Sequence, residues 1–181
     1  MADRIAALDW DRIGADLDVH GCAVAQALLS SGECAELRNS YSDESLFRSR
    51  IVMARHGFGR GEYKYFGYPL PELIVQFRTM LYPQLAEIAN RWNEMMDVAF
   101  LLSQPQTDFS GGEFILIEQR PRMQSRAEVA SLGQGDAIVF PVHHRPVKGT
   151  RGFYRVVMRH GVSRVRSGSR YTLGVIFHDA A

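Results

Sequence analysis

The second half of the chain is a succession of short apolar runs rich in β-branched residues, and each run ends in glycine or polar residues. Runs of this length and spacing predict β-strands separated by turns. Many short strands joined by glycine-rich turns favour a double-stranded β-helix, the jelly-roll or cupin-like type of sandwich. The runs occupy residues 97–102, 113–118, 127–132, 136–142, 154–158 and 171–177.

The first half has helical patterns instead. Between residues 71 and 95, apolar side chains recur at three- and four-residue steps, which predicts a long helix with a broad face towards the core. Ser30 and Glu33 have the spacing of a capping box, so a helix is expected over residues 31–40. Residues 2–16 predict a further short helix. We therefore expect an α+β fold with a mainly β core, in which N-terminal helices buttress the β-helix.

A length of 181 residues suits one domain with a proper core. We expect residues 1–96 to form a helical support region and residues 97–181 to form the β-helix core. No apolar run approaches the ~20 residues of a membrane span, and the N-terminal residues have no apolar signal segment. The two cysteines do not form a metal-like pair. A cytoplasmic protein with reduced thiols is therefore expected.

Charge is distributed unevenly along the chain. Residues 1–117 contain 10 Lys or Arg and 16 Asp or Glu, whereas residues 118–170 contain 11 basic and 3 acidic residues. A basic half favours an anionic co-substrate or a nucleic-acid backbone as partner. Arginines that alternate along strands also commonly face solvent, so the charge gives this interpretation mild support.

His160 and Arg170 are the first candidates for chemistry. The apolar runs at 154–158 and 171–177 flank a polar turn, which predicts a largely buried hairpin with His160 ending one strand and Arg170 beginning the next. Alternation along the second strand places Thr172 on the face of Arg170. Such residues could hold a metal and a carboxylate side by side. Without further signals, a structural histidine and a solvated arginine are the more common outcome.

The spacing of His160, Arg170 and Thr172, with two further motifs, resembles the Fe(II)/2-oxoglutarate dioxygenase superfamily. The motifs are DFSGGEF at 108–114 and GDAIVF at 135–140, in the order found in prolyl-hydroxylase-like members. The stretch from residue 112 to 178 is similar to a bacterial oxygenase family with an AlkB-like barrel, described as acting on alkylated DNA. The resemblance implies that His160 is an iron ligand and that Arg170 binds the far carboxylate of 2-oxoglutarate, with a hydrogen bond from Thr172.

The resemblance also implies a reaction. Fe(II), 2-oxoglutarate and O2 would be required, with ascorbate as an optional stimulant. A C–H bond would be hydroxylated while 2-oxoglutarate is decarboxylated to succinate, and no catalytic residue beyond the iron site is implied. The implied substrate is alkylated DNA or RNA, demethylated after the base is flipped out or presented single-stranded. A protein hydroxylase of the prolyl type and a non-catalytic binding barrel are the alternatives, and no membrane is involved in any of them.

A segment rich in glycine, aromatic and basic residues, at 55–68, is the candidate for substrate contact. Tyr63 and Tyr65 could stack on a flat ring, while Arg60 and Lys64 could meet phosphates. A hairpin that only packs against the barrel is an equally good interpretation of the same residues.

Half of the implied iron site is missing from the sequence. A 2-His-1-carboxylate triad needs a His-x-Asp or His-x-Glu pair before the distal histidine. None of the six histidines is followed two positions later by an acidic residue. The adjacent His143 and His144 are expected in a loop, because neighbouring strand residues point to opposite faces and cannot both bind one metal easily.

The junction at Met95–Met96 is where the missing pair belongs in the family pattern. The helix predicted over 71–95 runs there into the strand predicted at 97–102 without turn residues, which is unusual. Either a segment of the natural protein is absent from the sequence at this point, or this is a shortened protein without a normal iron site. The intact motifs on both sides favour an absent segment.

Overall fold

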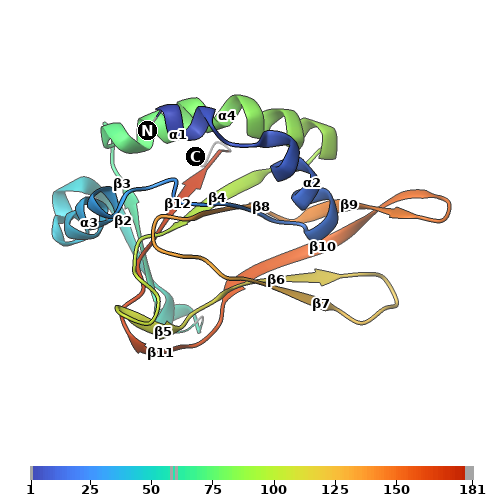
Figure 1. Ribbon diagram of the computed structural model, residues 1–181. Coiled ribbons are helices and arrows are strands. Elements are labelled where there is room, and N and C mark those ends of the chain that lie inside the picture. Colours follow the sequence, from blue (N-terminus) through green and yellow to red (C-terminus); the bar gives the residue numbers. More distant parts are fainter. Residues whose placement is uncertain (1, 58, 60, 178–181) are drawn as a thin grey trace.

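The computed structural model describes residues 2–57, 59 and 61–177, and two antiparallel four-stranded sheets dominate it (Figure 1). The covered sheet, in the order β1-β8-β4-β12, has helices over its outer side. The uncovered sheet has the order β7-β6-β10-β9. The covered sheet consists of β1 (Ala23–Ala25), β8 (Ala137–Pro141), β4 (Met96–Leu101) and β12 (Thr172–Ile176). The uncovered sheet consists of β7 (Arg126–Ala130), β6 (Phe114–Gln119), β10 (Gly152–Val162) and β9 (His144–Gly149).

The remaining elements surround these sheets. Two small antiparallel pairs, β2 with β3 and β5 with β11, complete the strands. Their bounds are β2 Phe47–Val52, β3 Glu62–Phe66, β5 Phe109–Gly111 and β11 Val165–Gly168. The α-helices are α1 (Ala2–Ala6), α2 (Trp10–His20), α3 (Ser31–Asn39) and α4 (Glu72–Trp92), and short 3-10 turns are η1 (Ser40–Ser42), η2 (Glu44–Leu46) and η3 (Met53–His56). The protein is thus a mixture of helices and mostly antiparallel strands.

Strand β8 of the covered sheet is buried on both faces. Along β8, Ala137 and Val139 belong to the apolar cluster beneath the helices, whereas Ile138 and Phe140 belong to the cluster between the two sheets. A strand buried on both sides needs apolar residues at every position, because successive side chains point to opposite faces. This explains why the sequence of β8 is a continuous apolar run.

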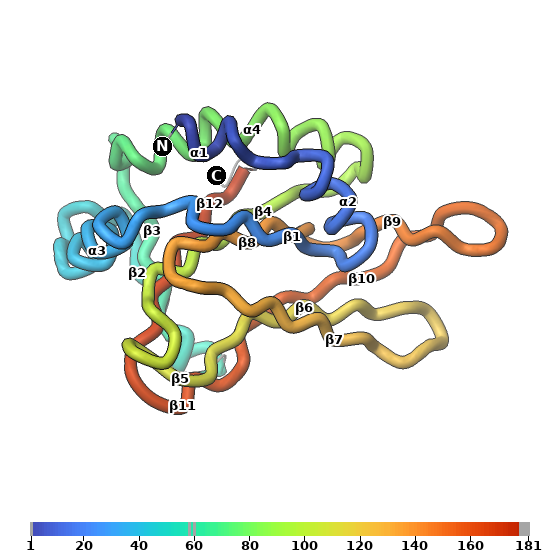
Figure 2. The backbone as a smooth tube through the Cα atoms, viewed as in Figure 1, coloured from blue at the N-terminus to red at the C-terminus, as the bar shows by residue number. Residues whose placement is uncertain are grey.

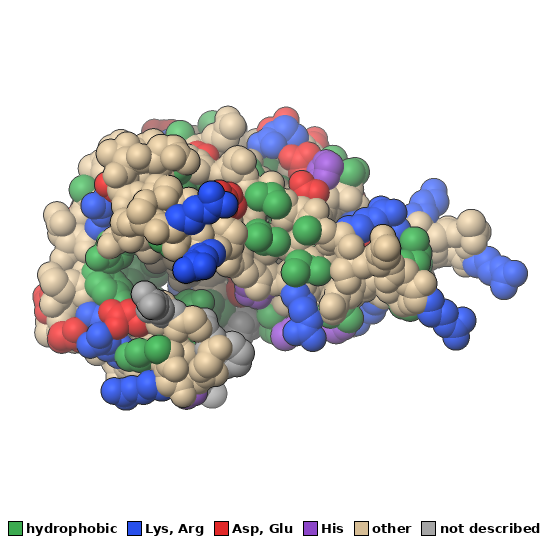
Figure 3. Space-filling view, turned by 90° about the horizontal axis from the view of Figure 1, so that it is seen from below, with side chains coloured by type: hydrophobic (Ala, Val, Ile, Leu, Met, Phe, Trp, Pro, Cys, Tyr) green, Lys and Arg blue, Asp and Glu red, His purple; other side chains and the backbone are tan. Residues whose placement is uncertain are grey.

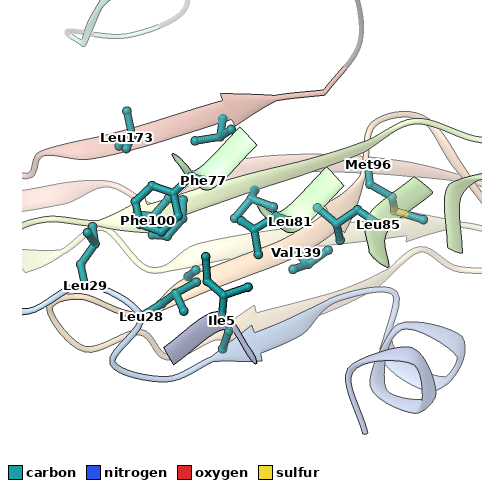
Figure 4. Close-up of a cluster of buried hydrophobic side chains, with 14 of the residues drawn as sticks. Ile5, Leu28, Leu29, Phe77, Leu81, Leu85, Met96, Phe100, Val139 and Leu173 are labelled. Carbon is teal, nitrogen blue, oxygen red and sulfur yellow. The ribbon is translucent and has the colours of Figure 1, made fainter. Parts of the chain in front are cut away.

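Helix α4 supplies most of the cover on this sheet. Its residues Phe77, Leu81 and Leu85 recur every four positions and lie in one cluster with Phe100 and Val139 (Figure 4). The rings of Phe77 and Phe100 have centroids 4.5 Å apart. Full burial of one such side chain contributes about 1.5–3 kcal/mol, so the stripe predicted over residues 71–95 is structural core.

The end of α4 differs from the prediction. Asn93 takes a left-handed conformation with φ of 50°, and its N–H donates to carbonyls of Ala89 and Asn90. The helix therefore ends at Trp92, and the residues up to Met95 form a connection before β4 begins at Met96. The expectation of a helix running into a strand without a turn is wrong, because asparagine tolerates this conformation and ends a helix much as glycine does.

The hairpin predicted over residues 154–177 is also absent from the described chain. β10 pairs with β6 and β9 in the uncovered sheet, whereas β12 pairs with β4 in the covered sheet. The two runs are strands as predicted, but the chain crosses from one sheet to the other between them. Short β11, paired with β5, lies on this crossing.

Two local expectations need correction and one is confirmed. His144 to Gly149 is strand β9, so residues predicted as a loop pair with β10. Residues 2–16 form two helices, because the Asp9 carboxylate accepts a hydrogen bond from Arg12 N and starts α2 anew. The capping box at α3 is present, with Ser30 and Glu33 bonded reciprocally.

Among the strands with one neighbour within the described residues are β12 and the last part of β10. β12 ends the covered sheet, and β10 beyond Val157 has β6 as its strand partner. Among the described helices, none is long and apolar enough to cross a membrane.

Candidate active site

His160 lies on β10 on the side that faces the covered sheet. Val156 and Met158, on the same side of the strand, are buried in the cluster between the sheets. The imidazole centroid is 4.7 Å from the Phe140 ring, and the imidazole stacks parallel to Phe114 at 6.5 Å. Burial against these rings, and then the nearby His143, lower the pKa of His160. The neutral imidazole, which is the form that binds metals, is therefore favoured.

Arg170 lies between β11 and β12, and its guanidinium carbon is 5.9 Å from the Phe109 ring centroid. Its Nε is buried and has no hydrogen-bond acceptor among the described residues. Burial lowers the pKa of Arg170, and the proximity of Tyr63 opposes this shift. A guanidinium stays charged at any physiological pH, so a buried N–H without an acceptor favours an anion at this position.

Gly112 makes the room for this arginine. A Cβ at residue 112 would come within 2.9 Å of Arg170 Cδ, and the glycine has a φ of +70°. Any other residue would therefore be strained and would displace the arginine side chain. The glycine pair of the DFSGGEF motif thus has a physical role in placing Arg170.

Thr172 faces the same region as His160. Leu173 and Val175 are buried beneath the helices, so alternation along β12 turns Thr172 towards the side of the uncovered sheet. Thr172 is paired in register with Leu101 of β4 and is exposed. Thr172 on the covered sheet therefore points towards the uncovered sheet, and His160 on the uncovered sheet points towards the covered sheet. Arg170 lies beside the β5–β6 connection.

The predicted substrate segment forms the β2–β3 pair, with Tyr63 and Tyr65 on one face of β3. Tyr63 is 56% exposed and is near enough to Arg170 to influence its pKa. This face of the pair therefore borders the Arg170 region. Arg60, the third predicted substrate contact, lies outside the described residues.

Lys64 is on the opposite face and does not fit the predicted phosphate contact. Its ammonium lies 4.3 Å from the ring centroid of Tyr41 and donates to Glu44 Oε1 at 2.6 Å. The side chain is 4% exposed. The lysine is an internal anchor of the pair, because strand alternation turns it away from Tyr63 and Tyr65.

The chain matches the model of a protein family described as "Oxygenase, catalysing oxidative methylation of damaged DNA", over residues 61–99 and 95–180. These segments make up more than half of the chain. The chain belongs to this family. The two matched segments of this oxygenase family overlap at residues 95–99, which is the start of β4. The match is therefore broken at the α4–β4 connection.

Curated relatives match part of the chain. An uncharacterized protein of Mycobacterium tuberculosis, matched in two strains, is 52% identical over 86 residues. The match covers 48% of this chain and 37% of the relative. The chain thus spans little more than a third of the length of the curated relatives it matches.

Solved structures show the same fold at low sequence identity. A prolyl 4-hydroxylase from Phytophthora capsici has a TM-score of 0.57 and 13% identity, covering 96% of this chain and 64% of its own. A Pseudomonas putida prolyl-4-hydroxylase has a TM-score of 0.55 and 11% identity, and the match covers 92% of this chain and 98% of its own. An oxidoreductase of the 2OG-Fe(II) oxygenase family from Burkholderia pseudomallei has a TM-score of 0.56 and 13% identity, and the match covers 97% of this chain and 94% of its own.

The described residues do not fit the iron ion that the resemblance implies. No group of three or more His, Cys, Asp or Glu in the described part of the chain could hold a metal ion. The groups described near His160 are His143 and the rings of Phe114 and Phe140. One or two imidazoles without a carboxylate fall short of a facial triad.

Sequence reasoning missed the residues that position Arg170. Phe109 stacks beneath the guanidinium, and Asp108 Oδ2 accepts hydrogen bonds from Arg38 at 2.7 Å and from Gln104 N at 2.8 Å. These contacts fix the DFSGGEF segment beside α3. Its consecutive glycines were the available signal, since left-handed backbone at both positions indicates a close approach.

Proposed function

We propose that the family-length protein, meaning this chain together with the segment considered absent at Met95–Met96, is an Fe(II)- and 2-oxoglutarate-dependent dioxygenase that demethylates alkylated nucleic acid. We propose further that this chain, a double-stranded β-helix, carries its co-substrate site. One observation carries the proposal: the buried Nε of Arg170 has no acceptor among the described residues. A carboxylate of 2-oxoglutarate would satisfy this donor with a charge-assisted, two-pronged hydrogen bond.

The residues of this chain would bind and orient the co-substrate. Arg170 would hold the distal carboxylate, Phe109 would keep the guanidinium flat against its ring, and Thr172 would add a hydroxyl donor. Tyr63 would exclude water from the same region. When bound, 2-oxoglutarate supplies the electrons for oxygen insertion into a C–H bond and leaves as succinate and CO2. His160 stays a proposed iron ligand whose partners are not among the described residues.

Nucleic acid is the proposed substrate for two reasons. The family description names damaged DNA, and residues 118–170 carry a strong excess of basic side chains. The exposed face with Tyr63 and Tyr65 could stack on an extruded base, with Arg60 at a phosphate. An N-methyl group hydroxylated there would leave as formaldehyde and restore the base.

Protein hydroxylation of the prolyl type is the second candidate. Two solved structures with this fold are prolyl 4-hydroxylases. A non-catalytic binding barrel becomes the better interpretation if the 181 residues are the whole protein, because the iron ligand set is then incomplete. A cytoplasmic location and an organisation as one domain, with support region 1–96 and core 97–181, belong to the same proposal.

Binding of 2-oxoglutarate by calorimetry, in the absence of metal, tests the co-substrate site directly. Succinate and formaldehyde release from methylated oligonucleotides, compared with succinate release on proline-containing peptides, separates the two catalytic candidates. The family-length protein, supplied with Fe(II) and ascorbate, is the material for this second assay. No binding of 2-oxoglutarate to either protein would reject the proposal.

A further inference from the structure

The outer face of the uncovered sheet has no helix over it, in contrast to the covered sheet (Figure 1). Along β10, Val156 and Met158 point inwards, so Phe153, Arg155, Val157 and Arg159 point outwards, and all four are exposed. This face is neither part of the core nor part of the Arg170 site.

Exposed apolar side chains gather on this face. Phe153 is 75% exposed, Val129 52%, and Ile117 and Val157 37% each. Figure 3, which views the molecule from below, shows apolar side chains grouped over the sheet with basic side chains around them. Large apolar residues grouped on an uncovered face indicate an interaction surface more often than isolated ones do.

The charge around this apolar group is strongly positive. Residues 114–130 and 144–162, the β6–β7 and β9–β10 hairpins, contain eight Lys or Arg and two Asp or Glu. Glu118 is bonded to Arg120 and Arg145, and Arg155 reaches Glu94. The other basic residues have no ion pair to an acid within the described chain. They are Arg122, Arg126, Lys148, Arg151 and Arg159.

Two of these cations, Lys148 and Arg151, lie close in the chain or the sheet to one aromatic ring, that of Phe153. Lys148 is paired in register with Phe153 across the β9–β10 hairpin, and Arg151 lies in the turn between them. Figure 2 shows both hairpins projecting beyond the rest of the molecule, side by side. A flat exposed ring next to unpaired cations is the combination with which proteins bind single strands, through base stacking and phosphate contacts.

We infer that the outer face of the uncovered sheet and the ends of its two hairpins bind single-stranded nucleic acid. Phosphates lie on Lys148 and Arg151, and one base stacks on Phe153. This deepens the proposed function, on which the choice of nucleic acid partly rests, by assigning a strand-binding surface apart from the Arg170 site. An enzyme that acts on an unpaired base gains from holding the strand on both sides of it.

The test is fluorescence anisotropy with a labelled oligothymidylate of about 15 nucleotides, in the absence of metal and 2-oxoglutarate. The wild-type chain is expected to bind, with affinity falling steeply between about 50 and 200 mM salt. The Lys148→Glu/Arg151→Glu variant is expected to bind about tenfold more weakly and with a smaller salt slope. The neutral variant Lys148→Gln/Arg151→Gln is expected to show a smaller loss in the same direction.

A charge-matched control separates this surface from net charge. The control variant Arg78→Glu/Arg91→Glu changes two residues of α4, which lies over the covered sheet. It should change the affinity for the oligonucleotide less than about twofold. Phe153→Ala should weaken binding about fivefold or more, whereas Phe153→Trp should retain it. Circular dichroism melting establishes that each variant is folded.

Several outcomes overturn the inference. These are no binding by the wild-type chain at low salt, equal weakening by the hairpin and α4 variants, or tighter binding of duplex that Phe153→Ala leaves unchanged. Binding of anionic phospholipid vesicles but not of the oligonucleotide would assign the surface to a membrane instead. Since the assay needs neither metal nor co-substrate, its failure is distinct from failure of 2-oxoglutarate binding at Arg170.

Discussion

Arg170 is the single side chain on which the co-substrate proposal depends, because its buried Nε lacks an acceptor among the described residues. Arg170→Ala should weaken 2-oxoglutarate binding by about 10- to 100-fold, the value of one or two charge-assisted hydrogen bonds. Arg170→Lys keeps the charge but loses the planar fork, so it should be intermediate. Calorimetry measures both. Arg166→Ala, on exposed β11, is the matched control, and an unchanged affinity in Arg170→Ala rejects the assigned role.

Arg145 is a second buried cation, but its role is structural. Its Nε donates to Glu118 Oε2 at 2.7 Å, and its other nitrogens donate to carbonyls of Asp18 and Val19 at the end of α2. Arg145→Leu removes one of the two cations paired with Glu118 and leaves Arg120. It should lower the free energy of unfolding by about 1.5–3 kcal/mol in urea titrations, the value of a hydrogen bond to a charged group.

Two comparisons make this prediction specific. The double variant Arg145→Leu/Glu118→Leu should recover part of the loss, because the buried Glu118 carboxylate is then removed together with Arg145. Arg91→Leu, which removes an exposed ion pair with Asp18, should cost less than about 1 kcal/mol. If the double variant were less stable than Arg145→Leu, the buried pair would itself be strongly stabilising.

The roles of some single residues can be predicted well from the sequence, and those of others poorly. The spacing of His160 and Arg170 could be recognised because it belongs to one short stretch of chain. The internal role of Lys64 and Arg145 could not, because each depends on partners far away in sequence, such as Tyr41 and Asp18. A basic residue looks the same in a sequence whether it meets solvent, a phosphate or a buried carboxylate.

Helix α3 illustrates how one carboxylate stabilises a whole element. Glu33 closes the capping box at Ser30 and accepts a hydrogen bond from Arg4 at 2.6 Å, which joins α1 to α3. The Arg4 hydrogen bond is the main cause that lowers the pKa of Glu33 to about 2. The unfolded chain therefore binds this proton more readily, and stability is lost as pH falls from about 4.5 towards 2.

The pH dependence can be measured by acid titration of the unfolding midpoint. Glu33→Gln should lower stability at neutral pH by about 1–3 kcal/mol, a range reduced for partial exposure. It should also flatten the loss of stability below pH 4.5. Glu36→Gln, at an exposed position of the same helix, should leave the pH profile unchanged. Identical pH profiles for Glu33→Gln and the wild type would show that Glu33 does not contribute to the loss of stability in acid.

The end of α4 depends on one residue as well. Asn93 has a φ of 50° and caps the helix before β4. Asn93→Val should lower thermal stability by about 1 kcal/mol or more, because a β-branched residue is strained in this conformation. Asn93→Gly should be neutral or slightly stabilising. Equal stability of the two variants would mean that the connection changes conformation freely.

Among the strands, the sequence predicts the segments but not their partners. Each run of 97–102, 113–118 and 136–142 corresponds to a strand within a residue or two. Burial on both faces explains the continuous apolar signal of β8. Nothing within 154–158 or 171–177 indicates that they join different sheets. Pairing is decided by the rest of the fold, which is why the predicted hairpin fails.

For the whole molecule, the ability to bind iron depends on residues far apart in the chain. The described residues include no three-ligand metal group, and the family match is broken at residues 95–99. The 181-residue protein should therefore bind Fe(II) only weakly under anaerobic calorimetry, and His160→Ala should change this little. Tight one-to-one binding that His160→Ala abolishes would show that the ligand set is complete after all.

The mass of the natural protein decides between the two explanations for the break. A mass clearly above 20.4 kDa, with extra peptides between residues 95 and 96, would show that a segment is absent from the sequence. A mass near 20.4 kDa would instead establish a shortened protein, and the asparagine-capped connection at Asn93 shows how such a chain closes.

The edge of β12 has a practical consequence. Its backbone has a partner on the β4 side only, within the described residues, so one row of amide and carbonyl groups is available for β-pairing. Such an edge can adhere to another copy of the chain, and a short strand containing Gly174 limits how firmly it does so. Sedimentation of the purified protein should thus reveal reversible, concentration-dependent association, and an added peptide of matching β-propensity should compete with it.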